Sequence, residues 1–356
     1  MIRTGILFAL LSGMCNGLFT APMKLESRWK WENIWFVFIL TSCWAMPSIT
    51  VATTVPGYRA IFSESPAATL ASASIFGFGW GFGAICFGRS VHHLGVSVAN
   101  SLVLGISSAL GSLVPLFMMH PTVSPLSVSV LFAGVLAFII GVVFCGNAAR
   151  LRDNSSDEMR ATSNSISGYI FAGIAGVMSA VFNIGYTLAQ PIANTGVSLG
   201  YSRESATNCI WLLMLGAGAI PNIVYCASLM MRNRTAHLLT TSDSGVATRS
   251  GSPQITGNWL KSERLRASWL RSIAMGLLWG GSILLYGAAT PKLGNLGPSV
   301  GWPLSLATGL LVANLAGIFL GEWRGVTMLA RRRMYQGISV LLAAIILCAA
   351  ASKLTS

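Results

Sequence analysis

Charged side chains are scarce in this chain of 356 residues: only 9% are Asp, Glu, Lys or Arg, whereas 53% are hydrophobic. A soluble domain carries roughly 25% charged residues, which cover its surface. So little charge excludes an ordinary soluble globular protein, because most of the outer surface has to face lipid instead of water. The composition therefore predicts an integral membrane protein.

Acidic residues and clustered metal ligands are also lacking. The ten Asp and Glu residues lie in connections or near the ends of apolar runs, never near the middle of one. A cavity for an organic cation usually needs a buried carboxylate, so an exporter of cationic drugs is disfavoured. The seven cysteines are scattered without a CxxC pair, and the four histidines form no cluster. We therefore expect no metal, no cofactor and no intramembrane enzyme.

Basic residues are in excess, with a formal net charge of +13. They lie between apolar runs and form no continuous stripe, so a nucleic-acid partner is not expected. Eighteen of the 23 Lys and Arg residues fall in the odd-numbered connections between the runs. Because cytoplasmic connections of membrane proteins are enriched in Lys and Arg, the odd connections are expected in the cytoplasm and both termini in the periplasm.

Ten apolar runs are long enough to cross a bilayer, which takes about 20 residues. The first run leads directly into further membrane segments, so we interpret it as a span and not as a signal peptide. The connection at residues 231–265 is polar and rich in Ser, Thr and Arg, which predicts a mobile cytoplasmic loop. The expected spans are residues 4–25, 33–54, 68–90, 95–119, 125–147, 166–190, 205–230, 267–290, 296–321 and 333–352.

Two pairs of spans resemble each other within the chain. GILFALLSGMCNGLF from Gly5 matches GYIFAGIAGVMSAVF from Gly168, and the run from Trp80 matches the run from Trp279. Because each half would hold five spans, an odd number, the second half would enter the membrane upside down. The sequence thus predicts an all-α membrane protein of two inverted five-helix repeats. The predicted repeats are residues 1–160 and 161–356.

Neutral amides and aromatic rings are the main polar groups within the expected spans. Asn183, Tyr186 and Gln190 recur at i, i+3 and i+7, on one face of the sixth span. Such groups suit a neutral polyol, whose hydroxyls form hydrogen bonds while its C–H faces stack on rings. The alternative is that they only join helices through hydrogen bonds. The candidate substrate-binding residues are Asn16, Trp80, Asn100, Asn183, Tyr186, Gln190, Trp279, Tyr286, Trp302 and Asn314.

Proton coupling would require a group that titrates. Glu32 begins the second span, Glu322 ends the ninth, and His92 and His93 lie between the third and fourth. Histidine titrates in the useful pH range. The alternatives are an interfacial ion pair of Glu322 with Arg324 and solvated histidines in a connection.

Several runs resemble the bacterial L-rhamnose/proton symporter family of the drug/metabolite transporter superfamily. They include GLFTAPMKLESRWKWENIW, GVMSAVFNIGYTLAQPI and FLGEWRG, and the resemblance covers essentially the whole chain. It implies ten spans in a bacterial cytoplasmic (inner) membrane and proton-driven uptake of L-rhamnose or a related small neutral sugar. The implied partners are the sugar, protons and the lipid bilayer.

The chain departs from that family at three polar positions and in the ninth span, where SVGWPLSLATG replaces a more polar aromatic run. Ala84 and Phe87 stand where the family pattern has Asn and Tyr, and Gln190 stands where it has Lys. These differences affect the identity of the substrate more than the fold. A uniporter or exporter of another small neutral metabolite is the alternative, and the sequence leaves the oligomeric state undetermined.

Overall fold

The computed structural model describes residues 1–119, 124–153, 166–241 and 258–354, and these form helices without strands. A helix satisfies every backbone hydrogen bond internally, which apolar surroundings demand. The elements are α1 (Ile2–Leu18), α2 (Ala21–Lys24), α3 (Trp31–Ile39), the π-helical turn η1 (Leu40–Ala45), α4 (Met46–Thr54), α5 (Tyr58–Glu64), α6 (Ala67–Met119), α7 (Pro125–Asp153), α8 (Ile166–Leu188), α9 (Gln190–Ser198), α10 (Arg203–Arg232), the 3-10 helix η3 (Ala236–Leu239), α11 (Asn258–Ala289), the 3-10 helix η4 (Thr290–Leu296), α12 (Gly297–Phe319) and α13 (Met328–Lys353).

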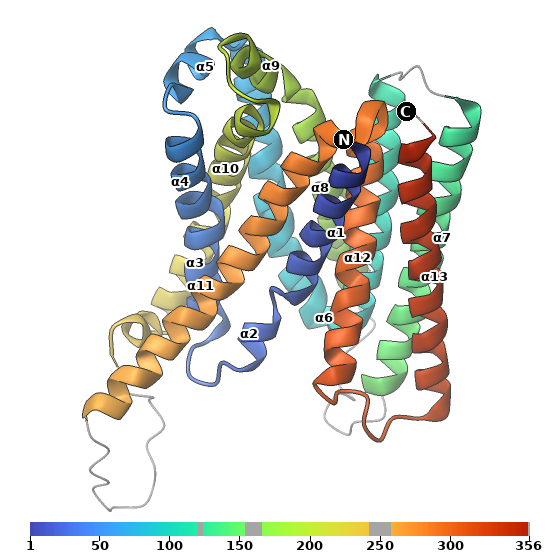
Figure 1. The fold of residues 1–356 in the computed structure, drawn as a ribbon. Coiled ribbons are helices and arrows are strands. Elements are labelled where there is room, and N and C mark those ends of the chain that lie inside the picture. The colour runs from blue at the N-terminus through green and yellow to red at the C-terminus, as the bar shows by residue number, and fades with distance from the viewer. Residues whose placement is uncertain (120–123, 154–165, 242–257, 355–356) are drawn as a thin grey trace, which may run out of the picture.

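Nine apolar segments within the described ranges are long enough to span a membrane. One of them, Glu263–Phe319, contains most of α11 and all of α12, which run in opposite directions (Figure 1). Gly294, with a φ of 78° that glycine adopts readily, makes the turn between them. With this segment counted as two, the described residues form ten membrane-spanning helical segments, which confirms the expected number of spans and their helical nature.

The long helix α6 reverses its direction along α8. Along the first part of α6, successive residues contact α8 closer and closer to its N-terminal end. Along the second part, the contacts return toward the C-terminal end of α8. α6 therefore forms two antiparallel spans, Ala67–Val91 and Val98–Met118. Successive contacts are Phe76 with Gly185, Gly83 with Met178 and Leu94 with Gly168, followed by Ile106 with Gly176 and Gly111 with Ala180.

Two helices lie inside the bundle, and two pairs form its edges. α1 packs against α11 and α12, whereas α8 packs against both parts of α6. At one edge α7 pairs with α13, and at the other α3 and α4 pair with α10 (Figure 1). The interior of the bundle is therefore built by α1, α6, α8, α11 and α12.

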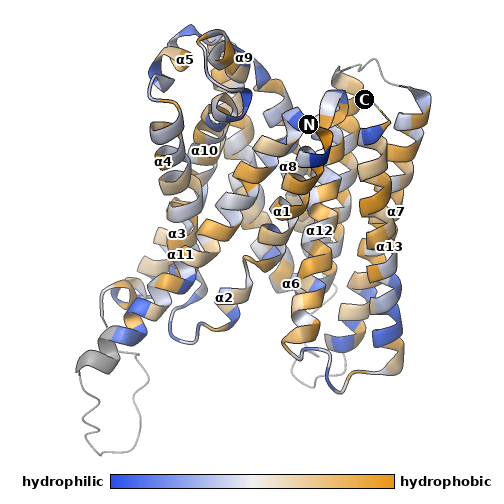
Figure 2. Ribbon diagram, viewed as in Figure 1, coloured by the Kyte–Doolittle hydropathy of each residue, from blue (hydrophilic) through white to orange (hydrophobic). Residues whose placement is uncertain are grey.

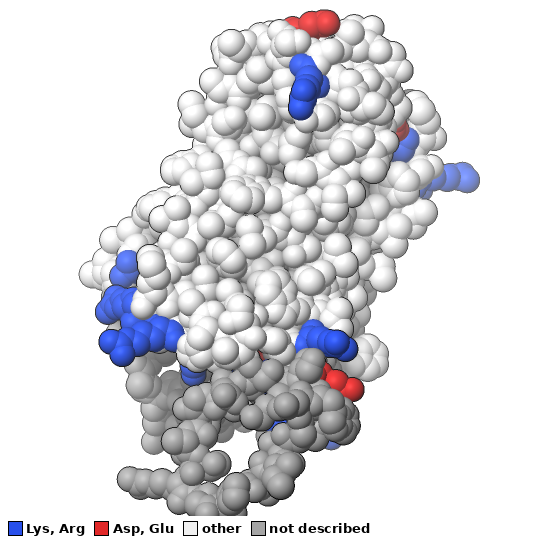
Figure 3. Space-filling view, turned by 90° about the vertical axis from the view of Figure 1, so that its left-hand side faces the viewer, with Lys and Arg blue, Asp and Glu red and all other residues white. Residues whose placement is uncertain are grey.

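The two ends of the bundle differ in charge. Both termini lie at one end, with α5 and α9, and α2 and the α12–α13 connection lie at the other (Figure 1). Hydrophilic residues lie at both ends, including the lower parts of α7, α11 and α13 at this second end (Figure 2). Lys and Arg cluster at the second end, below a broad band of the surface with few charges (Figure 3). We call it the basic end.

The structure describes the connection between α10 and α11 only at its two flanks. Of residues 231–265, the stretch 242–257 lies outside the described residues, as does the expected repeat boundary near residue 160. The described flanks are folded: η3 follows α10 closely, and α11 already begins at Asn258. Trp29 holds η3, because its Nε1 donates a hydrogen bond to the carbonyl of Leu238 at 2.9 Å.

Candidate functional site

A cavity of about 1700 Å³ extends from the interior of the bundle to the basic end. Its walls come from the parts of α1, α3, α6, α7, α10 and α12 that lie toward that end. Each of these walls ends in a connection at the basic end. The cavity is therefore one-sided, open to the end of the molecule where Lys and Arg gather.

Three of the predicted substrate-binding amides line this cavity. Asn16 comes from α1, Asn100 from the second part of α6 and Asn314 from α12. All three residues are partly exposed, and Nδ2 of Asn314 is buried without a hydrogen-bond partner among the described residues. An amide both donates and accepts hydrogen bonds, so the three can bind hydroxyl groups from different sides. Ala84 and Phe87, where the chain departs from the family pattern, also line the cavity.

An aromatic wall stands on one side of the cavity. The rings of Trp31 and Trp35 stack with centroids 5.2 Å apart, and Tyr225 packs against Trp31 at 6.5 Å. Trp35 Nε1 donates to Oδ1 of the buried Asn222 at 3.2 Å, and Asn222 Nδ2 donates to the carbonyl of Gly81 at 2.9 Å. Sequence reasoning missed these residues, although the i, i+4 spacing of the two tryptophans was a visible signal.

The mouth of the cavity is basic, and Glu322 is the one acidic residue among the described residues that line it. Its carboxylate accepts a hydrogen bond from Arg152 Nη1 at 3.0 Å and pairs with the ammonium of Lys24. The ion pair expected with Arg324 is thus replaced by these two. Cations at this distance stabilise an ionised carboxylate. The cations lining the cavity are Lys24, Arg89, Arg152, Arg232 and Arg324.

The other predicted proton-coupling residues differ in whether they line the cavity. His93 lines the cavity, and its ring stacks on Phe171 at 6.1 Å. The side chain of His92 lies outside the described residues. Glu32 does not line the cavity: it is buried and accepts hydrogen bonds from Asn233 Nδ2 at 3.0 Å and Thr235 Oγ1 at 2.9 Å. Glu32 thus joins α3 to the end of α10.

A packed block of aromatic and polar side chains fills the bundle between the cavity and the terminal end. Asn183 is fully buried, and its Nδ2 donates to the carbonyls of Gly111 at 2.7 Å and Pro298 at 3.2 Å. The hydroxyl of Tyr286 donates to Asn183 Oδ1. The hydroxyl of Tyr186 shares a hydrogen bond with Thr290 Oγ1. These contacts join α8 to α6, α11 and α12, and close that end.

The rest of the predicted substrate-binding set also belongs to this block and does not line the cavity. The rings of Trp80 and Trp279 stack with centroids 5.1 Å apart and planes 13° apart. Trp302 Nε1 donates to the carbonyl of Ser107 at 3.2 Å. Gln190 Nε2 donates to the carbonyl of Tyr186 at 3.3 Å.

One further ring in the block was missed by sequence reasoning. Trp211 is fully buried in α10 and stacks on Tyr186 with centroids 4.6 Å apart. Nearer the terminal end, an ion pair between Glu204 and Lys292 links the start of α10 to η4. The predicted polar set therefore separates into two groups, one in the open cavity and one in the closed block.

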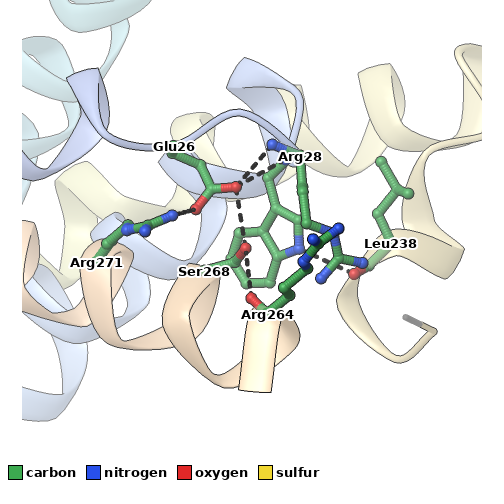
Figure 4. Close-up of polar contacts among 7 residues, drawn as sticks. Glu26, Arg28, Leu238, Arg264, Ser268 and Arg271 are labelled. Carbon is green, nitrogen blue, oxygen red and sulfur yellow. Dashed lines mark hydrogen bonds and ion pairs between the residues drawn. The ribbon is translucent and has the colours of Figure 1, made fainter. Parts of the chain in front are cut away.

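A buried carboxylate outside the cavity holds the basic end together (Figure 4). Glu26, with a side chain only 1% exposed, accepts hydrogen bonds from the backbone N–H groups of Arg28 and Trp29 at 2.9 and 3.2 Å. It also accepts from Ser268 Oγ and Arg271 Nη1, both at 3.0 Å. Burial raises the pKa of Glu26, but these hydrogen bonds outweigh it and lower the pKa below the ordinary value. No local sequence signal joins Glu26 to Ser268 and Arg271.

The comparisons with known proteins agree in one family. The family described as L-rhamnose-proton symport protein (RhaT) matches residues 1–354. An L-rhamnose-proton symporter of Klebsiella pneumoniae strain 342 is 25% identical over 329 residues, 90% of each chain. The L-rhamnose-proton symporter of Escherichia coli strain 55989 is 25% identical over 337 residues, 92% of this chain and 93% of its own. This chain therefore belongs to the L-rhamnose-proton symport protein family.

Proposed function

We propose that this protein takes up L-rhamnose or a closely related neutral sugar together with protons, by alternating access. The observation that carries the proposal is a cavity lined by amides and aromatic rings that is open at one end and closed at the other. Transporters of this kind bind substrate between two halves and open each side in turn. The relatives described above, named as L-rhamnose-proton symporters, support both the sugar and the proton.

The sugar is bound by Asn16, Asn100 and Asn314, with its C–H faces on the wall of Trp31 and Trp35. These amides lie on three different helices, so a bound sugar would hold α1, α6 and α12 together. The cavity is larger than a typical small-molecule pocket of about 300–1,000 Å³. In the open state the sugar would therefore leave readily, and tight contact would form as the cavity closes.

Glu322 carries the proton. In the state seen here Lys24 and Arg152 stabilise its carboxylate form, which fits release of a proton into the open cavity. Lys24 lies at the end of α2 and Arg152 on α7, so closing or opening of the cavity can change their distances to Glu322. Without these two cations the carboxyl group would take up a proton more readily.

We further infer that the two halves are inverted repeats and that both termini are periplasmic. Helices that correspond under the repeat have corresponding neighbours: α1 packs on α11 and α12, as α8 packs on the two parts of α6. The edge pairs, α7 with α13 and α3–α4 with α10, join corresponding spans. The stacked Trp80 and Trp279 are also corresponding residues. With the basic end in the cytoplasm, the cavity faces inward.

The test is uptake of labelled L-rhamnose into proteoliposomes containing the purified protein. An inward proton gradient should drive accumulation, a protonophore should abolish it, and unlabelled neutral sugars should compete to different extents. Equal uptake with and without the gradient would favour a uniporter. If monodisperse protein takes up no L-rhamnose, this sugar is excluded as the substrate. The positions that depart from the family pattern, Ala84, Phe87 and Gln190, would then be examined for a different specificity.

A matched pair of variants tests the cavity. Asn314→Ala should raise the KM for uptake, because one of three amides that bind hydroxyls is lost. Asn194→Ala removes an exposed amide on α9, far from the lining residues, and should leave uptake unchanged. The same KM in both variants would contradict the assignment of the cavity as the sugar site.

A further inference from the structure

A second cavity, of about 670 Å³, lies outside the proposed transport path, at the basic end of the α7–α13 pair. Phe144 from α7 forms one side, and the first turns of α13 form the other, with Arg331, Arg332, Tyr335, Gln336 and Val340. The pair stands at the edge of the bundle (Figure 1). This groove therefore faces the surroundings of the protein and not its interior.

The groove carries positive charge without a matching acid. Arg331 and Arg332 are exposed, and within the described part of the chain neither forms an ion pair. The next residue, Arg333, is occupied: its guanidinium lies over the ring of Phe144, 5.5 Å from the centroid, and donates to Gln336 at 3.5 Å. Two guanidinium groups are thus available to an anion in the groove.

An apolar surface continues from the groove toward the middle of the bundle. On α7, Leu136 and Ile140 are 59% and 41% exposed, and on α13, Leu342 and Ile346 are 46% and 67% exposed. Figure 2 shows the change from hydrophobic to hydrophilic residues near the lower ends of α7 and α13. The groove thus lies where the hydrocarbon of a membrane would give way to head groups.

We propose that this groove binds an anionic phospholipid. Its phosphate lies between Arg331 and Arg332, where a planar guanidinium can donate two hydrogen bonds to phosphate oxygens. Tyr335 and Gln336 supply further hydrogen bonds, and an acyl chain runs along the apolar surface of α7 and α13. Basic pockets between helices near a membrane surface favour anionic head groups in this way.

A second copy of the chain fits this surface less well. Copies in one membrane share the same orientation, so a two-fold axis would run along the membrane normal. It would bring the exposed arginines of both copies to the same depth. Like charges would then face each other without an acidic partner from the described residues, whereas a phospholipid supplies the missing negative charge.

The experiment measures lipid binding to the purified, delipidated full-length protein by native mass spectrometry. Dioleoylphosphatidylglycerol and dioleoylphosphatidylcholine are titrated separately, with the same apolar chains and different head-group charge. The variants are R331Q/R332Q and, as a charge-matched control, R264Q/R266Q, which removes two exposed arginines on α11 at the same end. Inorganic phosphate is added in a parallel series.

Wild type and the control variant should bind the anionic lipid about tenfold more tightly than the zwitterionic one, and R331Q/R332Q should lose this preference. The proposal is overturned by equal binding of both lipids to wild type, or by an unchanged preference in R331Q/R332Q. Displacement of the lipid by millimolar inorganic phosphate would assign the site to free phosphate instead. A lipid-free dimer that R331Q/R332Q disrupts would assign the surface to a second copy. Uptake of sugar by each variant confirms that it is folded.

Discussion

At the scale of single residues, the carboxylate of Glu322 is distinguished by its two cationic partners. It is the acidic residue that lines the described cavity, and Lys24 and Arg152 both reach it. Glu32, by contrast, is buried away from the cavity, between Asn233 and Thr235. We therefore expect replacement of the carboxyl group by an amide to change proton-driven uptake at Glu322 but not at Glu32.

Glu322→Gln should uncouple uptake from the proton gradient. The amide keeps the shape of the side chain but cannot take up a proton, so accumulation should fall to the level seen without a gradient. Exchange of labelled for unlabelled sugar should persist, because it needs no net proton movement. Both are measured in proteoliposomes. Glu32→Gln is the matched control, and gradient-driven accumulation that survives in Glu322→Gln would contradict the assigned role.

Glu26 predicts a loss of stability in acid. Because hydrogen bonds lower the pKa of Glu26 in the folded protein despite its burial, its contribution is fully present above the ordinary carboxyl pKa of about 4.3. The contribution is lost as the pH falls through the lowered folded-state value. Glu26→Gln leaves donors unmatched and should cost on the order of 1–3 kcal/mol at neutral pH.

Thermal unfolding of purified wild type and Glu26→Gln between pH 7 and pH 3 checks this sign. The difference in midpoint between the two proteins should be largest at neutral pH and should shrink toward pH 3. A difference that grows on acidification would contradict the lowered pKa. Glu263→Gln, an exposed acid on α11, serves as the control.

At the scale of helices, the closed end depends on the hydrogen bonds that α8 makes with α11. Tyr286 belongs to α11 and donates its hydroxyl proton to Asn183 on α8. Tyr286→Phe keeps the ring and removes that hydrogen bond. A net loss of about 1 kcal/mol corresponds to a change of about fivefold between the closed and open arrangements of this end.

A cysteine reporter at Ser299 measures that opening. Ser299 is 1% exposed at the start of α12 and should react slowly with a membrane-impermeant maleimide while the terminal end is closed. Reaction of Ser299→Cys should become about fivefold faster when Tyr286→Phe is added. The wild-type protein gives the background, because its cysteines are buried except for the partly exposed Cys15. An unchanged rate would show that this hydrogen bond does not hold the end closed.

The spans could be predicted from the sequence because hydrophobic length is a local property. The expected run 205–230 and the helix Arg203–Arg232, for example, agree within two residues at each end. The order around Ala236–Leu239 could not be predicted from composition, because it depends on Trp29, about 200 residues away.

The candidate site was predictable in kind but not in position. The pattern of amides and aromatic rings included Asn16 and Asn314, which lie on α1 and α12 and line the cavity. It could not distinguish them from Asn183, whose Nδ2 is taken up by two carbonyl groups. Periodicity identifies a helix face, whereas the choice between lining a cavity and joining helices depends on the neighbouring helix.

At the scale of the whole molecule, the distribution of charge predicts the orientation. A cysteine at Lys353, near the C-terminus, should react with an impermeant maleimide in intact cells, and a cysteine at Lys30 should react only after the membrane is permeabilised. Both positions are exposed in the structure. Labelling of Lys30→Cys alone in intact cells would reverse the orientation and make the cavity face outward.

The stacked pair of Trp80 and Trp279 has a consequence for how the molecule moves. In a transporter of inverted repeats, the outward-open conformation can be derived from the inward-open one by giving each half the conformation of the other. Every residue then has the neighbours that its counterpart had before. Under the proposed repeat these two rings are counterparts, and they touch each other, so the exchange would leave their contact in place. The pair would then be the pivot of the movement. The helices would tilt about it, and hydrogen bonds toward the two ends of the bundle would break and form while the two indole rings stay in contact.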